Sequence, residues 1–435
     1  MKKTGLAAFL CFTLSLQALT LDEAVQTALN NSVEIKKISM DVELAKENIK
    51  EKKASHYGRV DFQGSYTHYN LPRTLTPLTP ASMVNGAAQI PTTQDIFVAG
   101  VAYNVNLFTG MSDTHSIEIA NLQKEMAKNI TALSSEQIIY NVKTLYTNIL
   151  ALNAQIDAQQ EYVEALKKLH EDIELKVKLE TLSRIDELKS LAELNHAKND
   201  LKKITTNRDI LKESLATLMF VDTISNLEPI DIKVDEIPLK QNNYKATLMQ
   251  SKKLTLSKQS IQKSIKQEQI ASASYYPKVA LNAYYGQSAG YNDATNPKPD
   301  EFNHEQLWQI GIDLKWNIFD FGKTSSLTQK SKIATLQAQL DEAQTKRELT
   351  KDLKEALSKI ELAISSYKSA QSELSLMEET QKIEQIRYDN GASDINDLLY
   401  TKARYQLAHS GFINARYEYQ NAIDYLNYIL EKGNK

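Results

Sequence analysis

Two periodic patterns of apolar residues alternate along the chain. Between residues 323 and 390, apolar or small side chains recur at steps of three and four, and neither Gly nor Pro interrupts them. The residues that form this seam are Leu353, Leu357, Ile360, Ile364, Tyr367, Leu374 and Met377. A spacing near 3.5 residues predicts a helix that needs a partner helix along its whole length. At about 1.5 Å per residue such a helix would extend for about 100 Å, which indicates a rod or a tube.

Turn signals divide the helical pattern into hairpins. The sequence DNG at 389–391 indicates a tight turn, so residues 322–431 are predicted to form a helical hairpin. Residues 111–220 also lack Gly and Pro and predict another hairpin. Its reversal is expected at 181–186, with Ser183 as the cap of the returning helix.

Shorter helices are expected before each pair of strands. One is predicted for residues 21–55, where Thr20 is a suitable N-cap and Glu23 its capping-box partner. The other is predicted for residues 244–274.

Four segments show a period of two, which is typical of strands with one apolar and one polar face. They are residues 58–69, 96–108, 276–288 and 306–319. The last is the clearest. Its apolar face carries Trp308, Ile310, Ile312, Leu314, Trp316 and Ile318, and its polar face carries Gln309, Gly311, Asp313, Lys315 and Asn317.

The order of helix, strand pair and helical hairpin occurs twice, which indicates an internal repeat. Residues 56–60 (HYGRV) correspond to 275–279 (YYPKV), and VNLF at 105–108 corresponds to WNIF at 316–319. We predict a first repeat at 19–228, a linker at 229–243 and a second repeat at 244–435. A proline-containing loop at 70–94 would connect the first two strands.

The only long apolar run lies at the N-terminus. Lys2 and Lys3, an apolar stretch and the small residue Ala18 predict a signal peptide at 1–18. The only cysteine, Cys11, lies inside it after Leu10, where a lipoprotein signal requires a small residue, so no lipid anchor is expected. With 24% charged residues the chain is too polar for a bundle of transmembrane helices.

Strands of this length and alternation in an exported chain fit a transmembrane β-barrel. Trp308 and Trp316 lie on one face, about 26 Å apart at about 3.3 Å per residue, close to the separation of two aromatic girdles. Tyr103 and Tyr285 are expected in the same lipid-facing girdles. Four strands cannot close a barrel and open edges are not tolerated in lipid, so two chains would give eight strands and three would give twelve. A soluble sandwich with two core tryptophans is the alternative.

Enzymatic and nucleic-acid-binding functions are not indicated. The seven histidines are dispersed, without a pair at metal-ligand spacing or a nucleophile motif, so we expect no enzyme, no cofactor and no metal site. The formal net charge of -3 gives no basic footprint for nucleic acid.

Three local motifs resemble the TolC-type outer-membrane efflux protein family. They are TLDEA at 20–24, WNIFDFG at 316–322 and the segment from Tyr388 to Leu399. The resemblance implies an α+β membrane protein that forms a homotrimer, with a 12-stranded outer-membrane β-barrel continued by a 12-helix periplasmic α-barrel. The linker at 229–243 would belong to an equatorial belt.

The same resemblance implies the function and the partners. The trimer would be the exit duct of a tripartite efflux or type I secretion system, exporting drugs, toxic compounds and also proteins. Its partners would be a periplasmic adaptor and an inner-membrane pump. It would lie in the outer membrane, with most of the chain in the periplasm.

A periplasmic gate is implied at the second hairpin. Tyr388 matches the family's hairpin tyrosine, Gly391 its turn, and Asp397 an aspartate of its lumenal ring, while Glu187 stands at the acidic position of the first hairpin. Tyr388 is expected to donate a hydrogen bond to the neighbouring hairpin, with Glu187 as its acceptor.

Three positions depart from the family pattern at this gate. Ser393 falls where a basic residue is expected, Tyr400 where a second ring aspartate is expected, and Thr181 where a Gly is usual. Asp397 and Glu187 could instead be solvated helix charges.

Two other functions fit parts of the pattern. A periplasmic coiled-coil structural or adaptor protein without a channel would use the hairpins but has no need for the alternating strands and paired tryptophans. A passive porin would use the strands but has no need for the helical hairpins.

Overall fold

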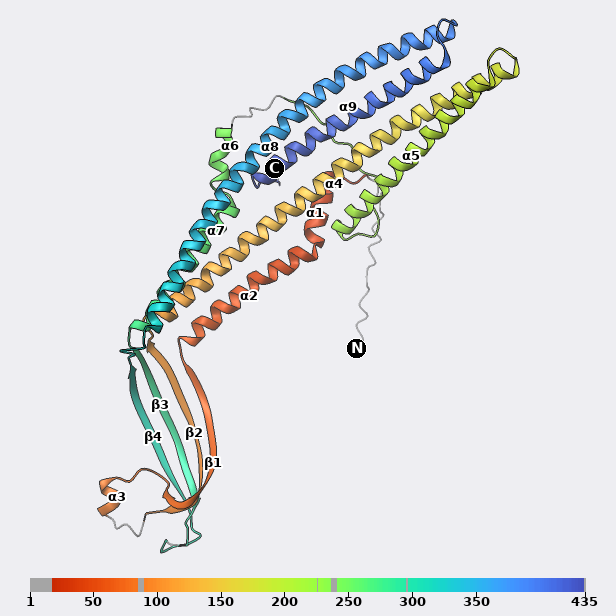
Figure 1. The fold of residues 1–435 in the computed structure, drawn as a ribbon. Coiled ribbons are helices and arrows are strands. Elements are labelled where there is room, and N and C mark those ends of the chain that lie inside the picture. The colour runs from red at the N-terminus through yellow and green to blue at the C-terminus, as the bar shows by residue number, and fades with distance from the viewer. Residues whose placement is uncertain (1–17, 85–89, 225, 236–240, 295, 434–435) are drawn as a thin grey trace, which may run out of the picture. The chain divides into compact units, whose positions relative to one another are not determined.

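The fold is described by a computed structural model that covers residues 18–84, 90–224, 226–235, 241–294 and 296–433 (Figure 1). Apart from Ala18, the predicted signal peptide at 1–18 lies outside these described residues. The chain divides into two compact units. One contains residues 1–39, 129–255 and 344–435, and the other contains residues 40–128 and 256–343.

The second of these units contains one antiparallel sheet in the order β1-β2-β3-β4 (Figure 1). Its strands are β1 (Arg59–Thr74), β2 (Thr92–Phe108), β3 (Lys278–Tyr291) and β4 (Phe302–Lys315). The register places Val101 opposite Tyr285 and Tyr285 opposite Trp308. Residues directly opposite each other share a face, so the apolar faces predicted for separate strands combine into one surface.

The first connection is shorter than the predicted loop at 70–94. β1 continues to Thr74 and β2 begins at Thr92, because Arg73 still pairs with Thr93 after a register shift. Pro72 lies within that irregular segment of an edge strand, where a missing N–H is tolerated. The connection contains the short helix α3 (Pro80–Val84).

The fourth strand also differs from its prediction at 306–319. It runs over Phe302–Lys315, so Trp316 and Ile318 lie beyond its end. Pairing stops there because Lys315 is opposite Lys278, the first residue of β3. The Trp316 indole N–H donates to the Tyr275 carbonyl at 3.1 Å instead of continuing the alternation of the strand.

Each of the two shorter predicted helices is broken once. Residues 21–55 form α1 (Leu21–Asn31) and α2 (Val33–Ser55), and the region predicted at 244–274 forms α6 (Gln241–Leu248) and α7 (Lys252–Ser272). A buried serine stands at both breaks. The Ser32 hydroxyl accepts from the Ile35 N–H at 3.2 Å, and the Ser251 hydroxyl accepts from the Leu254 N–H at 3.3 Å. Each serine therefore caps a new helix.

The predicted capping box of Thr20 and Glu23 is confirmed. The Glu23 N–H donates to the Thr20 hydroxyl at 3.2 Å, and the Thr20 N–H donates to the Glu23 carboxylate at 3.0 Å. α1 packs in the helical unit, where Asn31 donates to the Met219 carbonyl at 3.1 Å.

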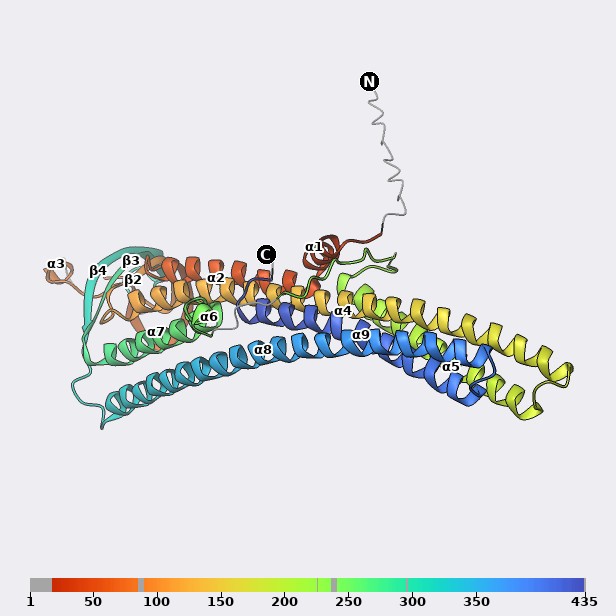
Figure 2. The same cartoon turned by 90° about the horizontal axis from the view of Figure 1, so that it is seen from above.

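Two long hairpins dominate the helical unit, and Figure 2 shows their turns toward the same end of it. The first consists of α4 (Ser112–Lys178) and α5 (Arg184–Met219), and the second of α8 (Lys323–Asp389) and α9 (Ile395–Ile429). Side-chain amides join α4 to α9, with Gln406 donating to Gln159 at 2.9 Å. The N-terminal parts of α4 and α8 continue into the sheet unit.

The chain around the start of the predicted linker is attached to the helical unit. Leu227 forms a parallel β-bridge with Leu19 and is buried. Ile232 is buried in an apolar cluster that includes Leu353 of α8 and Tyr419 of α9. The Tyr146 hydroxyl lies 2.7 Å from the Leu19 carbonyl oxygen and 2.8 Å from that of Glu228. One buried tyrosine of α4 thus contacts both the N-terminal segment and Glu228, the residue before the predicted linker.

Among the described residues, no helix has both the length and the apolar character that crossing a membrane would require.

Candidate functional site: the tips of the helical hairpins

The two hairpin turns are built differently. In the second turn Gly391 has a φ of 72°, a conformation that favours glycine, and Asp394 caps α9 by accepting from the N–H groups of Asn396 and Asp397. In the first turn the left-handed residue is Glu180, with a φ of 60°, and not Thr181. Ser183 caps α5 as predicted and forms a capping box with Asp186.

The two hairpins pack together near these turns. A buried apolar cluster joins Leu166 and Ile173 of α4 to Leu194 of α5 and to Leu398 of α9. Lys189 of the first hairpin also donates to the Asn396 side chain of the second at 2.9 Å.

Tyr388 is partly buried against this cluster. Its hydroxyl is buried and has no hydrogen-bond partner among the described residues. The Lys176 ammonium lies 5.4 Å from the centre of its ring. Burial raises the pKa of Tyr388, and the charge of Lys176 opposes that shift. The phenol is therefore neutral at pH 7 and able to donate.

Within a single chain, Tyr388 does not donate to Glu187. The Glu187 carboxylate pairs with Arg184 one turn earlier on the same helix, and its side chain is 13% exposed. The expected bond between these two residues can form only if it joins different chains or if the tip rearranges.

The remaining predicted gate residues face solvent in the single chain. Asp397 is exposed, and one of its oxygens lies 3.5 Å from the Ser393 hydroxyl. Tyr400 is also exposed, with the Arg404 guanidinium 5.9 Å from its ring centre. Neither side chain is required for packing within the chain, so both are available for a lumen or an interface.

Glu384, which is only 7% exposed, was not predicted from the sequence. Its carboxylate accepts from Arg387 at 2.9 Å and from the Ser393 hydroxyl on the other side of the turn. The signal in the sequence was an acidic and a basic residue three positions apart, a spacing that is common on solvated helices. That spacing alone could not distinguish this pair.

The structure places the predicted girdle residues at several levels of the sheet. Trp308 is 70% exposed and lies opposite Tyr285, which is also exposed. Tyr103 lies opposite Ala283, two residues along the strand from the position opposite Tyr285. Its hydroxyl donates to the Tyr57 carbonyl at 2.9 Å. Trp316 lies beyond the end of β4 and is exposed.

A family model described as outer membrane efflux protein matches residues 24–219 and 243–430, most of the chain. The chain belongs to the outer membrane efflux protein family. This confirms the resemblance found in the sequence. The protein is therefore an efflux channel of the outer membrane with a large periplasmic helical portion, and the family consists of channels and not of enzymes.

Known relatives agree with this assignment. The chain is 22% identical over 353 residues to outer membrane protein TolC of Vibrio cholerae, covering 79% of this chain and 78% of that protein. The fold is similar to the Campylobacter jejuni CmeC outer membrane channel, with a TM-score of 0.75 and 17% identity over 95% of this chain and 86% of that one. It is also similar to the Vibrio cholerae outer membrane protein VceC, with a TM-score of 0.78 and 14% identity over 94% and 96% of the two chains.

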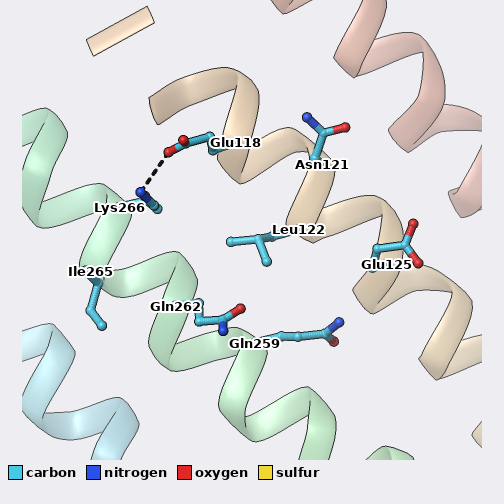
Figure 3. Close-up of a pocket in the computed structure, with 8 residues that line it drawn as sticks. All are labelled: Glu118, Asn121, Leu122, Glu125, Gln259, Gln262, Ile265 and Lys266. Atoms are coloured by element: carbon cyan, nitrogen blue, oxygen red, sulfur yellow. Dashed lines mark ion pairs between the residues drawn. The ribbon is translucent and has the colours of Figure 1, made fainter. Parts of the chain in front are cut away.

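The sheet unit of this efflux protein also contains a groove of about 490 Å³ between α4 and α7 (Figure 3). Lys266 of α7 pairs with Glu118 of α4 at 2.8 Å, as the dashed line shows. His115 also lies 2.9 Å from Glu118. The hydrogen bond from Lys266, followed by that from His115, lowers the pKa of Glu118. The ion pair of Lys266 and Glu118 joins α7 to α4. Among the described residues, no group of three side chains is placed to hold a metal ion.

Proposed function

We propose that three copies of this chain form one outer-membrane duct, the exit of a tripartite efflux or type I secretion system. The observation that carries the proposal is the open four-stranded sheet. β1 and β4 each have one unpaired edge. Unpaired backbone groups are not tolerated in lipid, so the edges must pair with other copies of the same sheet. Twelve strands from three chains would close a barrel like those of the family.

The two faces of the sheet fit such a wall. On one face, Ile310, Ile312 and Leu314 are all exposed in the single chain and have no protein covering them. On the other face, Asp313 accepts from Asn282 of the neighbouring strand. An apolar outside and a polar inside are the arrangement of outer-membrane barrels. The apolar side chains would therefore contact lipid, and Asp313 would face water.

The hairpins would form the periplasmic tunnel, with twelve helices from three chains. A passive porin has no need for such hairpins, and a coiled-coil rod has no need for the sheet. The partners would be a periplasmic adaptor and an inner-membrane pump, and the cargo would be drugs or other toxic compounds, and proteins if a secretion system uses the duct.

The tip residues would form the closed end of this tunnel. Threefold symmetry would bring three Asp397 carboxylates around one pore, where a ring of like charges favours cations. Tyr388 would donate to an acceptor on the neighbouring hairpin, for which Glu187 is the candidate. Tyr400 would stand beside the ring, and Gly391 would allow the tight turn.

Two measurements test the proposal. Detergent extraction of the outer membrane should yield a heat-labile trimer that conducts ions in planar bilayers. Disruption of the gene should increase susceptibility to a panel of drugs or stop the export of a secreted protein. A trimer without conductance would support the rod instead, and conductance without any effect on export would support the passive porin.

A further inference from the structure

We infer that Glu384 is a positioning residue that links the two sides of the second hairpin turn and thereby holds Tyr388 and Asp397 in place. Its role in gating rests on the proposed function, in which the hairpin tips close the duct. Glu384 lies on α8 five residues before the helix ends at Asp389.

The location of Glu384 is unfavourable for an acid. The residue is 7% exposed, and burial of an unpaired carboxylate would be costly. It also stands near the C-terminal end of a helix, where the helix dipole disfavours negative charge. Glu378, on the same helix, pairs with Lys382 at 2.7 Å but its side chain is 51% exposed. The buried carboxylate of Glu384, unlike the exposed one of Glu378, therefore requires hydrogen-bond partners in a defined geometry.

Those partners come from both sides of the turn. Arg387, in the last turn of α8, donates to one carboxylate oxygen at 2.9 Å, and Ser393, after the turn, donates to the other. Arg387 also donates to the Ala392 carbonyl at 3.4 Å. The carboxylate and the guanidinium thus connect the end of α8 with the residues that lead into α9.

This arrangement explains the serine at the position where a basic residue was expected. The guanidinium is supplied by Arg387, before the turn, and Ser393 completes the contact with its hydroxyl. Among the described residues, these contacts all lie within one hairpin.

The same contacts constrain the position of Tyr388 and the hydrogen bonding of Asp397. Tyr388 follows Arg387 directly, so a fixed Arg387 holds the backbone that carries the phenol. The Ser393 hydroxyl has one proton, and its donation to Glu384 leaves Asp397 with a contact of 3.5 Å, at the outer limit of a hydrogen bond. The Asp397 carboxylate is thereby left free to face water.

The test is the gating of the purified trimer in planar bilayers. Glu384→Ala should increase the ratio of open to closed time by about tenfold, which corresponds to about 1.4 kcal/mol. Ser393→Ala should act in the same direction with a smaller effect. Glu378→Gln is the matched control, because it removes an acid from the exposed pair of the same helix, and it should gate like the wild type.

A conservative variant separates positioning from general damage. Glu384→Gln keeps the size of the side chain and one acceptor oxygen, so it should open less often than Glu384→Ala. The inference is overturned if Glu384→Ala gates like Glu378→Gln in an intact trimer, or if Glu384→Gln opens as often as Glu384→Ala. A wild-type trimer that does not conduct would instead overturn the proposed function.

Discussion

At the scale of single residues, the hydroxyl of Tyr388 is the clearest sign of a missing partner. It is buried and makes no hydrogen bond within the described chain, although its ring packs well. Buried donors that remain unsatisfied are rare in native proteins. A partner supplied by another chain of the proposed trimer would satisfy it.

Tyr388→Phe should therefore raise the conductance of the closed trimer. A hydrogen bond to a charged acceptor contributes about 1.5 to 3 kcal/mol, and its loss would loosen the tip. The single chain should fold equally well, because the hydroxyl has no partner there. Planar-bilayer recordings are the measurement, and Tyr367→Phe, on the same helix but packed on Phe412, is the control. Unchanged conductance would show that Tyr388 serves only for packing.

Asp397→Ala should weaken both the preference for cations and the block by multivalent cations. Three carboxylates around one narrow pore attract cations, and the substitution removes all of them at once. Reversal potentials in asymmetric salt measure the preference, and the exposed Glu379 changed to Ala is the control. If selectivity and block persist in an intact trimer, Asp397 is a solvated helix charge.

At the scale of elements, the periodic patterns predicted which segments form helices and strands more accurately than they predicted where those elements end. Both hairpins and all four strands occur, but β4 ends before Trp316 and each short helix is broken at a serine. The breaks at Ser32 and Ser251 are separated by the same offset as the repeated segments 56–60 and 275–279. The internal repeat therefore extends to a feature that apolar spacing does not reveal.

The alternation of β4 predicts opposite environments for neighbouring residues. A cysteine at Ile312 should react with lipid-soluble reagents only, and a cysteine at Asp313 with water-soluble reagents. Ile312→Arg should cost about 2 to 4 kcal/mol if the residue lies near the middle of the bilayer. Labelling in native membranes is the measurement, and the reverse pattern would invalidate the assignment of the two faces.

The contacts of Tyr146 with Leu19 and Glu228 lead to a prediction about stability. Tyr146 is fully buried, and its hydroxyl is within hydrogen-bond distance of the Leu19 and Glu228 carbonyls. Tyr146→Phe removes this donor and should destabilise the fold by about 1 to 3 kcal/mol. Thermal unfolding measures the loss. Tyr140→Phe is the control, since the ring of Tyr140 stacks on Tyr428 but its hydroxyl has no partner among the described residues. Equal stability of the two variants would contradict the proposed role of Tyr146.

At the scale of the whole molecule, the open sheet requires an assembly. Each repeat supplies two strands and one hairpin, and neither can close a barrel. Because identical edges are repeated in each copy, β4 of one copy can pair with β1 of the next until the ring closes. The proposed trimer would in this sense be a consequence of unpaired backbone groups, while the number three comes from the likeness to the family.

The sequence by itself determined the types of elements, their order, the internal repeat and the family. These depend on spacings of two to four residues and on short motifs, which are local properties of a chain. Tertiary structure decided which strands pair at which residues, where β4 ends and how Ser32 interrupts a helix. It also decided that Tyr388 meets Lys176 and that Glu384 meets both Arg387 and Ser393. Such contacts depend on burial and on partners brought together by folding, and no local period specifies them.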